Sequence, residues 1–349
     1  MLFTTSSTIK QYANSIRCIY GTGGRVKVKT AAISSIGSNS AVCGGDVSID
    51  GGNAVTAKGI CWSTSQNPTI SNSHTTDGSG LGSFTSTMTG LTAMTPYYVR
   101  AYATNSLGTV YGDEIMVVIP NANDGSSCTG TPTVTDKNGN TYNTIQLGNQ
   151  CWMKENLRAT SYSDGTAITY GGGSSTSTTT GYYYYPYGNS SNMASMGLLY
   201  NQYAAMRGAA NSNSNPSGVQ GVCPSGWHLP SQVEWEQLIN YVRGIPNYQC
   251  NGHTNYIPPF CSTSGWYNGS TCTPGHSLAT NNSTGFTVMP SGHYDGSSYQ
   301  TSGYYASFWC SKYSSSYGTT TLFAFHDTYV RESYLRQLGY GCSVRCVKD

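Results

Sequence analysis

Short runs of alternating apolar and polar residues fill positions 27–119. A clear example is Tyr97-Tyr-Val-Arg-Ala-Tyr-Ala, and turn-forming residues such as Asp50-Gly-Gly-Asn separate one run from the next. Alternation with a period of two is typical of strands that bury one face, and many short strands with Gly, Asn and Asp turns indicate a β-sandwich. We therefore predict a β-sandwich over residues 27–119.

The pattern changes after the polar stretch 120–127, which we interpret as a linker to a second domain that begins near Cys128. Alternating runs on both sides of Asn138-Gly-Asn indicate a hairpin. Further on, Ser231 and Glu234 have the spacing of a capping box, and an apolar stripe of helical period follows them. The clearest helix of the chain is therefore expected directly after Ser231.

The two ends of the chain carry a similar motif. Tyr12-Ala-Asn-Ser-Ile-Arg-Cys-Ile and Tyr340-Gly-Cys-Ser-Val-Arg-Cys-Val match when Cys18 is aligned with Cys346. We interpret residues 1–20 as the last strand of a preceding copy of the C-terminal domain, followed by a flexible linker over 21–26. A coincidental strand is the alternative. We expect the chain to be a fragment of a longer modular protein, which would explain why it shows no signal peptide.

Composition narrows the classes of partner. Charged residues make up 9% of the chain and the formal net charge is +2, so we expect no nucleic-acid partner. No apolar run is long enough to span a membrane, so direct membrane insertion is not expected either. The 12 cysteines favour disulfides in an oxidising compartment, because their spacing fits zinc poorly. We expect a secreted or cell-surface protein with no cofactor and no metal, or alternatively a phage tail protein.

The predicted sandwich resembles a known domain family. The stretch from Leu91 to Gly108 resembles the late strands of fibronectin type III domains, and Gly59-Ile-Cys-Trp-Ser resembles an inner strand of the variant found in surface proteins of the Bacteroidetes. The resemblance covers most of residues 27–119 and implies a fibronectin III/Ig-like sandwich. Cys43 and Cys61 are predicted to bridge its sheets, with two buried thiols as the alternative.

The second domain resembles the Fibrobacter succinogenes major paralogous domain, a bacterial family related to C-type-lectin-like folds. The motifs that carry the resemblance are Asn149-Gln-Cys-Trp-Met-Lys-Glu-Asn-Leu, Gly197-Leu-Leu-Tyr-Asn, Cys223-Pro-Ser-Gly-Trp-His-Leu-Pro-Ser, Gly285-Phe-Thr-Val-Met-Pro-Ser-Gly and Ser343-Val-Arg-Cys-Val. The resemblance covers residues 128–349. It implies an exported α+β domain of C-type-lectin-like fold, mostly strand and loop, with its two ends close together.

Disulfides are expected within the domain so defined. Cys223 and Cys346 bracket it, and a bridge between them would close a loop of more than 100 residues. Such a bridge stabilises the fold by roughly 4–5 kcal/mol in the chain-entropy model. The other expected pairs are Cys128 with Cys151 and Cys250 with Cys272. Cys310 with Cys342 is a further candidate pair, and the pairing of Cys261, Cys310 and Cys342 is left open.

The segment from Gly292 to Gln337 is the expected ligand-binding face. Its tyrosines stand among Ser, Gly and Thr, and tyrosine gives a large amphipathic contact with few rotatable bonds to restrict. The residues expected to contact a ligand are His293, Tyr294, Tyr299, Tyr304, Tyr305, Trp309, Tyr313, Tyr317, Phe325, His326, Tyr329, Arg331, Tyr334 and Arg336. Alternatively, these tyrosines only cover a polar domain rich in loops.

The same segment is similar to the variable region of proteins diversified by retroelements. Ser307-Phe-Trp-Cys-Ser matches the aromatic segment of those proteins, although Cys310 stands where serine is usual. The resemblance implies that exposed positions of this face are exchanged between copies of the domain. Diversification of the ligand-binding face is therefore one of our hypotheses.

These features favour an adhesin or receptor-binding protein whose partner is a protein or glycan on another cell or host surface. A calcium-dependent lectin is not expected, because the Glu-Pro-Asn, Gln-Pro-Asp and Trp-Asn-Asp motifs are absent. We expect no enzyme activity, and we interpret Glu155 and His228 as structural hydrogen-bonding residues. The alternatives are a stalk or filament spacer without a specific ligand, and a thiol enzyme that resembles formylglycine-generating enzymes and uses Cys310 and Cys342.

Overall fold

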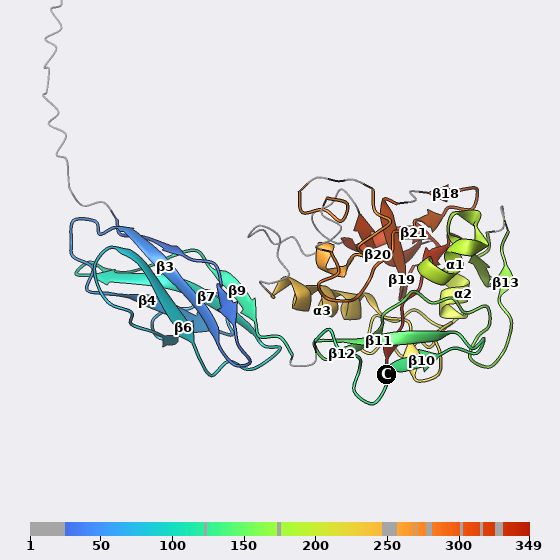
Figure 1. The fold of residues 1–349 in the computed structure, drawn as a ribbon, viewed down its shortest axis with the longest axis horizontal. Helices are drawn as coiled ribbons and strands as arrows, with labels where there is room; N and C mark the ends of the chain where they lie inside the picture. Colours follow the sequence, from blue (N-terminus) through green and yellow to red (C-terminus); the bar gives the residue numbers. More distant parts are fainter. Residues whose placement is uncertain are drawn as a thin grey trace, which may run out of the picture.

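The chain folds as two bodies joined end to end (Figure 1). The computed structural model describes residues 25–121, 124–172, 176–245, 257–267, 269, 271–276, 281–300, 303–314, 317–324 and 331–349. The repeat predicted over residues 1–20 lies outside the described residues. In Figure 1 the blue and cyan strands form the first body, and the green to red segments form the larger second one. Within the described residues, no helix combines the length and apolar character needed to cross a membrane.

The first body is a sandwich of two mostly antiparallel sheets. In one sheet the central strand β3 (Ala41–Ile49) pairs with β1 (Lys27–Thr30), β2 (Ser35–Ile36) and β6 (Gly82–Met88). The members of the other sheet are β4 (Ala57–Ser63), β5 (Ser73–His74), β7 (Pro96–Asn105), β8 (Gly108–Tyr111) and β9 (Ile115–Val118). The predicted fibronectin III/Ig-like sandwich is therefore confirmed.

Alternation places the core of the sandwich between its sheets. Ile60 of β4, Val99 of β7 and Val117 of β9 are all fully buried in one apolar cluster. The hydroxyl of Tyr97 accepts a hydrogen bond from the Thr92 backbone N–H at 3.1 Å. A tyrosine near the start of a late strand that bonds back to the preceding chain is a feature of immunoglobulin-like sandwiches.

The predicted bridge between Cys43 and Cys61 is wrong. Both residues are buried thiols. Cys43 belongs to the core cluster with Ile60, but Cys61 follows Ile60 on the same strand and therefore points to the opposite face of its sheet. There the Cys61 thiol lies 3.4 Å from the carbonyl oxygen of Pro68. Burial raises the pKa of each thiol to about 11.

The second body begins with a sheet that joins its two ends. The predicted hairpin around Asn138 is confirmed, because Thr135 pairs with Thr141 across that turn. The last strand of the chain pairs antiparallel with the start of the domain through Trp152 and Val347, so the ends are close together, as the family resemblance implies. The strands of this sheet, in spatial order, are β10 (Thr133–Thr135), β11 (Thr141–Leu147), β12 (Gln150–Met153), β23 (Val347–Lys348) and β16 (Trp227–His228).

Disulfides fasten the same region. Cys128 is joined to Cys151 with an S–S distance of 2.04 Å, and Cys223 to Cys346 with one of 2.02 Å, as expected. Cys272 is also disulfide-bonded, whereas Cys250, its expected partner, lies outside the described residues.

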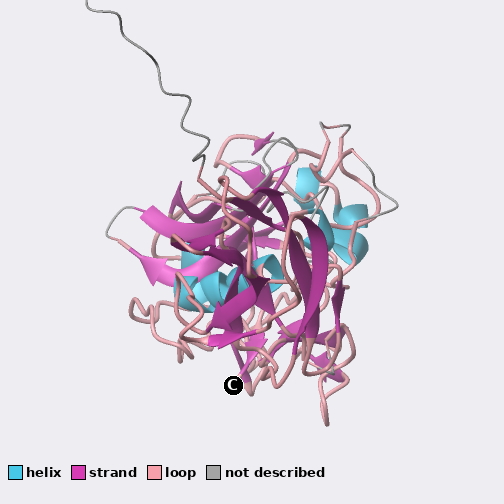
Figure 2. Ribbon diagram, turned by 90° about the vertical axis from the view of Figure 1, so that its left-hand side faces the viewer, coloured by secondary structure: helices cyan, strands magenta, loops and turns pink. Residues whose placement is uncertain are grey.

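A seven-stranded mixed sheet carries the C-terminal half of the domain. In spatial order its strands are β13 (Thr169–Tyr170), β14 (Tyr182–Tyr184), β15 (Leu199–Tyr200), β22 (Cys342–Ser343), β19 (Tyr305–Tyr313), β20 (Tyr317–Ala324) and β21 (Arg331–Gln337). A separate hairpin of β17 (His293–Tyr294) and β18 (Tyr299–Gln300) lies beside it. Strands and loops make up most of the molecule, and Figure 2 shows short cyan helices against mostly magenta strands and pink loops. The domain is therefore α+β with mostly strand and loop.

The helical elements are short except for one. They are η1 (Pro186–Gly188), η2 (Ser190–Asn192), α1 (Met193–Met196), α2 (Gln202–Met206), α3 (Gln232–Arg243) and η4 (Pro258–Phe260). The capping box predicted for α3 is present, since the Ser231 side chain accepts from the Glu234 backbone N–H and the Glu234 side chain accepts from Ser231. The buried stripe of α3 packs against Trp152, Phe286 and Phe308 in one core cluster.

The predicted pair of Cys310 and Cys342 is wrong. Both residues are thiols in the structure. Cys310 lies in the core cluster that also contains α3, whereas Cys342 lies in the second large cluster with Trp309. Trp309 and Cys310 are neighbours on β19, so their side chains point to opposite faces of the sheet. Because Cys342 lies on the same side as Trp309, the sheet separates its sulfur atom from that of Cys310. Burial raises the pKa of Cys342 to about 12.

Candidate functional site

Three residues of the predicted ligand face belong to the interior. Tyr294 and Trp309 are fully buried, and His293 is 7% exposed. Trp309 donates its indole N–H to the carbonyl of Tyr200 at 2.6 Å, and Tyr294 packs its ring against that of Tyr184 with centroids 4.4 Å apart. The prediction that these three contact a ligand is therefore wrong. The strand pattern showed aromatic residues without showing which face of the sheet other elements would cover.

The remaining predicted residues are spread over the surface and the rim of the core. Tyr304 and Tyr317 are exposed, at 37% and 44%. The half-buried ones are Tyr299, Tyr305, Tyr313, Arg331, Tyr334 and Arg336. Those that lie outside the described residues are Phe325, His326 and Tyr329. Most of the described residues that are not buried therefore lie on the adjacent strands β19, β20 and β21.

One cavity does include part of that face. Its volume is about 870 Å³, and it is lined by residues 176–178, 295–297 and 337–340 together with Tyr317. We call it the hydroxyl hollow, because most of its lining side chains are Thr, Ser or Tyr. Tyr317 starts β20 and pairs with Gln337 at the end of β21, so the base of this hairpin forms one wall.

Neighbouring elements fix the other walls. The turn at 337–340 is tied to α2, whose Gln202 N–H donates to the Leu338 carbonyl at 2.9 Å. The segment 176–178 is tied to Asn201, whose side-chain amide donates to the Ser177 carbonyl at 2.8 Å. A β-carbon added to Gly296 would lie 2.4 Å from the Thr176 methyl, so this wall requires glycine. The hollow is therefore built from residues 176–178, 295–297 and 337–340 and from Tyr317, which are separated in the sequence.

Asp295, the carboxylate among the described lining residues, accepts hydrogen bonds within its own turn. Asp295 accepts hydrogen bonds from the backbone N–H groups of Ser297 and Ser298 at 2.9 and 2.8 Å, and from the Gln300 amide at 2.8 Å. Burial alone would raise the pKa of Asp295, but these hydrogen bonds lower it to about 2. The Asp295 carboxylate is therefore charged at neutral pH, and its hydrogen bonds are made within the turn.

The ring of Tyr340 packs against the imidazole of His293. It stacks on the imidazole of His293 with centroids 5.9 Å apart and an interplanar angle of 23°. Burial, together with the nearby charge of Arg336, lowers the pKa of His293 to about 4. The imidazole is therefore neutral at pH 7, and the Tyr340 ring that lines the hollow rests on an uncharged planar surface.

About half of the lining lies outside the face predicted from the sequence. Tyr340 and the segment 176–178 lie outside the predicted face between Gly292 and Gln337. The run of Ser and Thr at 174–180 is a sequence signal that could have drawn attention to the segment. Its position beside β20 could not be read from the sequence, since it follows from the pairing of strands more than 100 residues apart.

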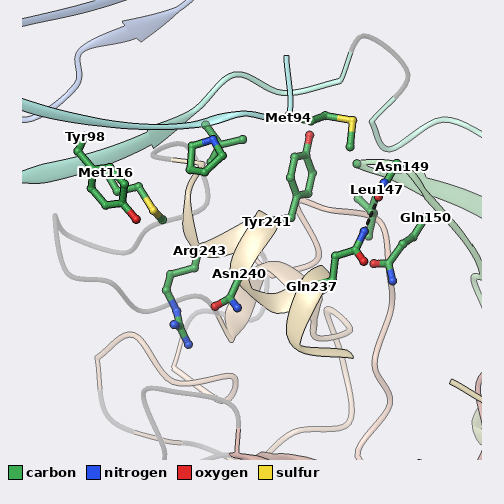
Figure 3. A pocket seen from close by; sticks show the side chains of 13 residues that line it. Met94, Tyr98, Met116, Leu147, Asn149, Gln150, Gln237, Asn240, Tyr241 and Arg243 are labelled. Carbon is green, nitrogen blue, oxygen red and sulfur yellow. Dashed lines mark hydrogen bonds between the residues drawn. The ribbon is translucent and has the colours of Figure 1, made fainter. Parts of the chain in front are cut away.

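A second cavity, of about 490 Å³, lies between the two bodies (Figure 3). Met94, Tyr98 and Met116 line it from the sandwich, and Tyr241 and Arg243 line it from α3. At its edge the Val118 N–H donates to the Gly244 carbonyl at 2.9 Å. This cavity is therefore part of the seam between the sandwich and the second domain.

Two other polar clusters are structural. His228 is almost fully buried, with its ring nitrogens 2.7 Å from a Glu234 carboxylate oxygen and 2.6 Å from one of Asp349, so its interpretation as a structural hydrogen-bonding residue is confirmed. Arg345 is fully buried and donates to the Asn156 side chain and to the Phe286 and Thr287 carbonyls. Among the described residues no three His, Cys, Asp or Glu side chains are grouped to hold a metal ion.

A family model matches the second body, and each of three solved structures covers about a third of the chain or less. Residues 145–348 match the family model described as Fibrobacter succinogenes major domain. Among solved structures, the twitchin kinase region from C. elegans matches with 20% identity over 32% of this chain and 19% of that chain, with a TM-score of 0.21. The sensor domain of the anti-sigma factor RsgI4 of Pseudobacteroides cellulosolvens matches with 15% identity over 27% and 93%, with a TM-score of 0.22.

A third solved structure, the third fibronectin III domain of human KIAA0343 protein, matches with 16% identity over 34% of this chain and 98% of that one, with a TM-score of 0.21. The chain spans about a fifth of the twitchin region. No curated protein matches the chain.

Proposed function

This chain belongs to the Fibrobacter succinogenes major domain family, and we propose that it is a secreted or cell-surface binding protein. In this proposal the fibronectin III-like sandwich presents the second domain, and the hydroxyl hollow holds a ligand displayed on another cell or host surface. The two disulfides, Cys128–Cys151 and Cys223–Cys346, support export, because such bridges persist in oxidising compartments.

The observation that carries the proposal is the hydroxyl hollow itself. It combines a volume within the range of ligand sites with exposed tyrosine and convergent polar groups. Tyr317 is 44% exposed at its edge, so its ring is accessible to a ligand in the hollow. The fixed ring of Tyr340 would lose little conformational freedom when a ligand binds.

The thiol-enzyme alternative receives less support. A nucleophilic cysteine needs a lowered pKa and access to solvent. Burial instead raises the pKa of Cys342 to about 12, and Cys310 is fully buried as well. We therefore propose a binding protein without enzyme activity. Diversification by a retroelement stays a hypothesis, and it would affect recognition only at exposed positions such as Tyr304 and Tyr317.

Binding of the full chain to an array of purified glycans and immobilised surface proteins tests this function. We expect Tyr317→Ala to weaken binding of the captured ligand about tenfold, since it removes an exposed aromatic contact. The matched control is Tyr304→Ala, an exposed tyrosine of the predicted face that does not line the hollow. Capture of no array component, or an equal loss in both variants, would contradict the proposal.

A further inference from the structure

The charge of the hydroxyl hollow restricts what it can take. Among the described residues that line it there is neither lysine nor arginine, so none of them attracts a phosphate, sulfate or carboxylate. The charged group among them, Asp295, already accepts hydrogen bonds from Ser297, Ser298 and Gln300. An uncharged ligand therefore fits the lining better than an anion or a cation.

The polar groups of the lining are mostly hydroxyls. A hydroxyl donates one hydrogen bond and accepts others, and the Gln337 amide likewise offers both kinds of group. Thr176 and Thr178 are exposed in the wall formed by residues 176–178. A ligand whose own groups are hydroxyls can pair with such a lining in either direction, whereas a lipid chain would leave these groups without partners.

The lining also supplies flat apolar faces. Tyr340 presents a ring that His293 holds in place, and Tyr317 presents an exposed ring on the wall formed by β20. An aromatic ring packs against apolar surface while its hydroxyl reaches polar groups. A pyranose ring has both kinds of surface, with C–H groups on its faces and hydroxyls around its edge.

We infer that the hydroxyl hollow binds a neutral saccharide, stacked on Tyr340 or Tyr317 and hydrogen-bonded to the Thr, Ser and Gln side chains around it. The inference rests on the proposed function, because it names the ligand class for the same hollow. Glycine at 296 and 339 supports it: a β-carbon at Gly339 would lie 3.1 Å from the β-carbon of Thr176, so side chains there would narrow the space that a sugar ring needs.

The test is calorimetric titration of the full chain with three sets of oligosaccharides: neutral, uronic-acid-containing and sulfated. We expect neutral oligosaccharides to bind and charged ones of the same length to bind at least about tenfold more weakly. Tyr317→Ala should weaken binding about tenfold. The matched control is Tyr170→Ala, because Tyr170 is 46% exposed, close to the value for Tyr317, and lies outside the hollow.

Variants that keep the fold separate stacking from hydrogen bonding. Tyr340→Phe preserves the ring and its stack on His293, so it should weaken binding less than Tyr340→Leu does. Thermal unfolding of each variant confirms that it is folded. Preference for the charged oligosaccharides would overturn the inference. If a protein ligand loses affinity in Tyr317→Ala while no saccharide binds, the inference fails and the proposed function stands. If no ligand depends on the hollow, both fail.

Discussion

Arg345 shows how one residue of the repeated motif holds the second domain together. Its guanidinium is fully buried, donates to the Asn156 side chain and two carbonyls, and lies over the ring of Phe286 at 4.5 Å. Burial lowers its pKa to about 9. Because the partners are neutral, the arginine stabilises the fold by satisfying buried acceptors rather than by forming an ion pair.

Replacement of this guanidinium should therefore destabilise the domain even when the charge is kept. We expect Arg345→Lys to lower the free energy of unfolding by about 2–4 kcal/mol, because an ammonium cannot reach all three acceptors or stack on Phe286. Urea denaturation measures the change. The control is Arg207→Lys, since Arg207 forms an exposed pair with Asp164 and should matter much less. Similar losses in both variants would contradict this account.

At the scale of the element, local signals in the sequence predicted well, whereas the distant Cys223–Cys346 bridge was expected only because the family resemblance defined the domain. The capping box of α3, the hairpin at Asn138 and the disulfide between Cys128 and Cys151 depend on residues close together in the chain. Alternation also identified strands correctly. It could not show which elements cover each face, so Trp309 was placed on the surface although it belongs to the core. The hydroxyl hollow was only partly predicted for the same reason.

A titratable histidine packs against the start of α3. His228 of β16 lies between the carboxylates of Glu234 and Asp349. Burial alone would lower the pKa of His228, but hydrogen bonds and charge from the two carboxylates raise it above 6.5. A base whose pKa is raised by folding stabilises the protein below the unfolded pKa and loses this contribution as pH rises through the folded value.

The protein should therefore lose stability as pH rises above about 6.5, and His228→Gln should remove that part of the pH dependence. Unfolding free energies from urea titrations at several pH values provide the measurement. His293 acts in the opposite direction, because its lowered pKa reduces stability as pH falls from 6.5 toward about 4. The difference between wild type and His228→Gln isolates the effect, and an identical slope in the two proteins above pH 6.5 would refute it.

The whole molecule depends on the seam between its two bodies. Within the stretch 120–127, predicted as a linker, Gly125 and Ser126 pair with the second domain: the Gly125 N–H donates to the Gln146 carbonyl at 2.9 Å, and the Gln146 N–H donates to the Ser126 carbonyl at 2.8 Å. The Tyr241 hydroxyl of α3 donates to the Asp124 carboxylate and accepts from the Asn121 N–H at 2.8 Å. These bonds favour a fixed orientation of the second domain on the sandwich.

A fixed seam should be sensitive to this single hydroxyl. We expect Tyr241→Phe to weaken the coupling between the domains by about 1–3 kcal/mol, because the half-buried Asp124 carboxylate loses a donor and the Asn121 N–H an acceptor. Small-angle scattering should then show a broader distribution of interdomain distances, and thermal unfolding should separate into two transitions. Tyr98→Phe is the matched control, because Tyr98 lines the same cavity from the sandwich side (Figure 3). Unchanged scattering in Tyr241→Phe would mean that packing of Met94, Met116 and the helix, and not the hydroxyl, holds the two bodies together.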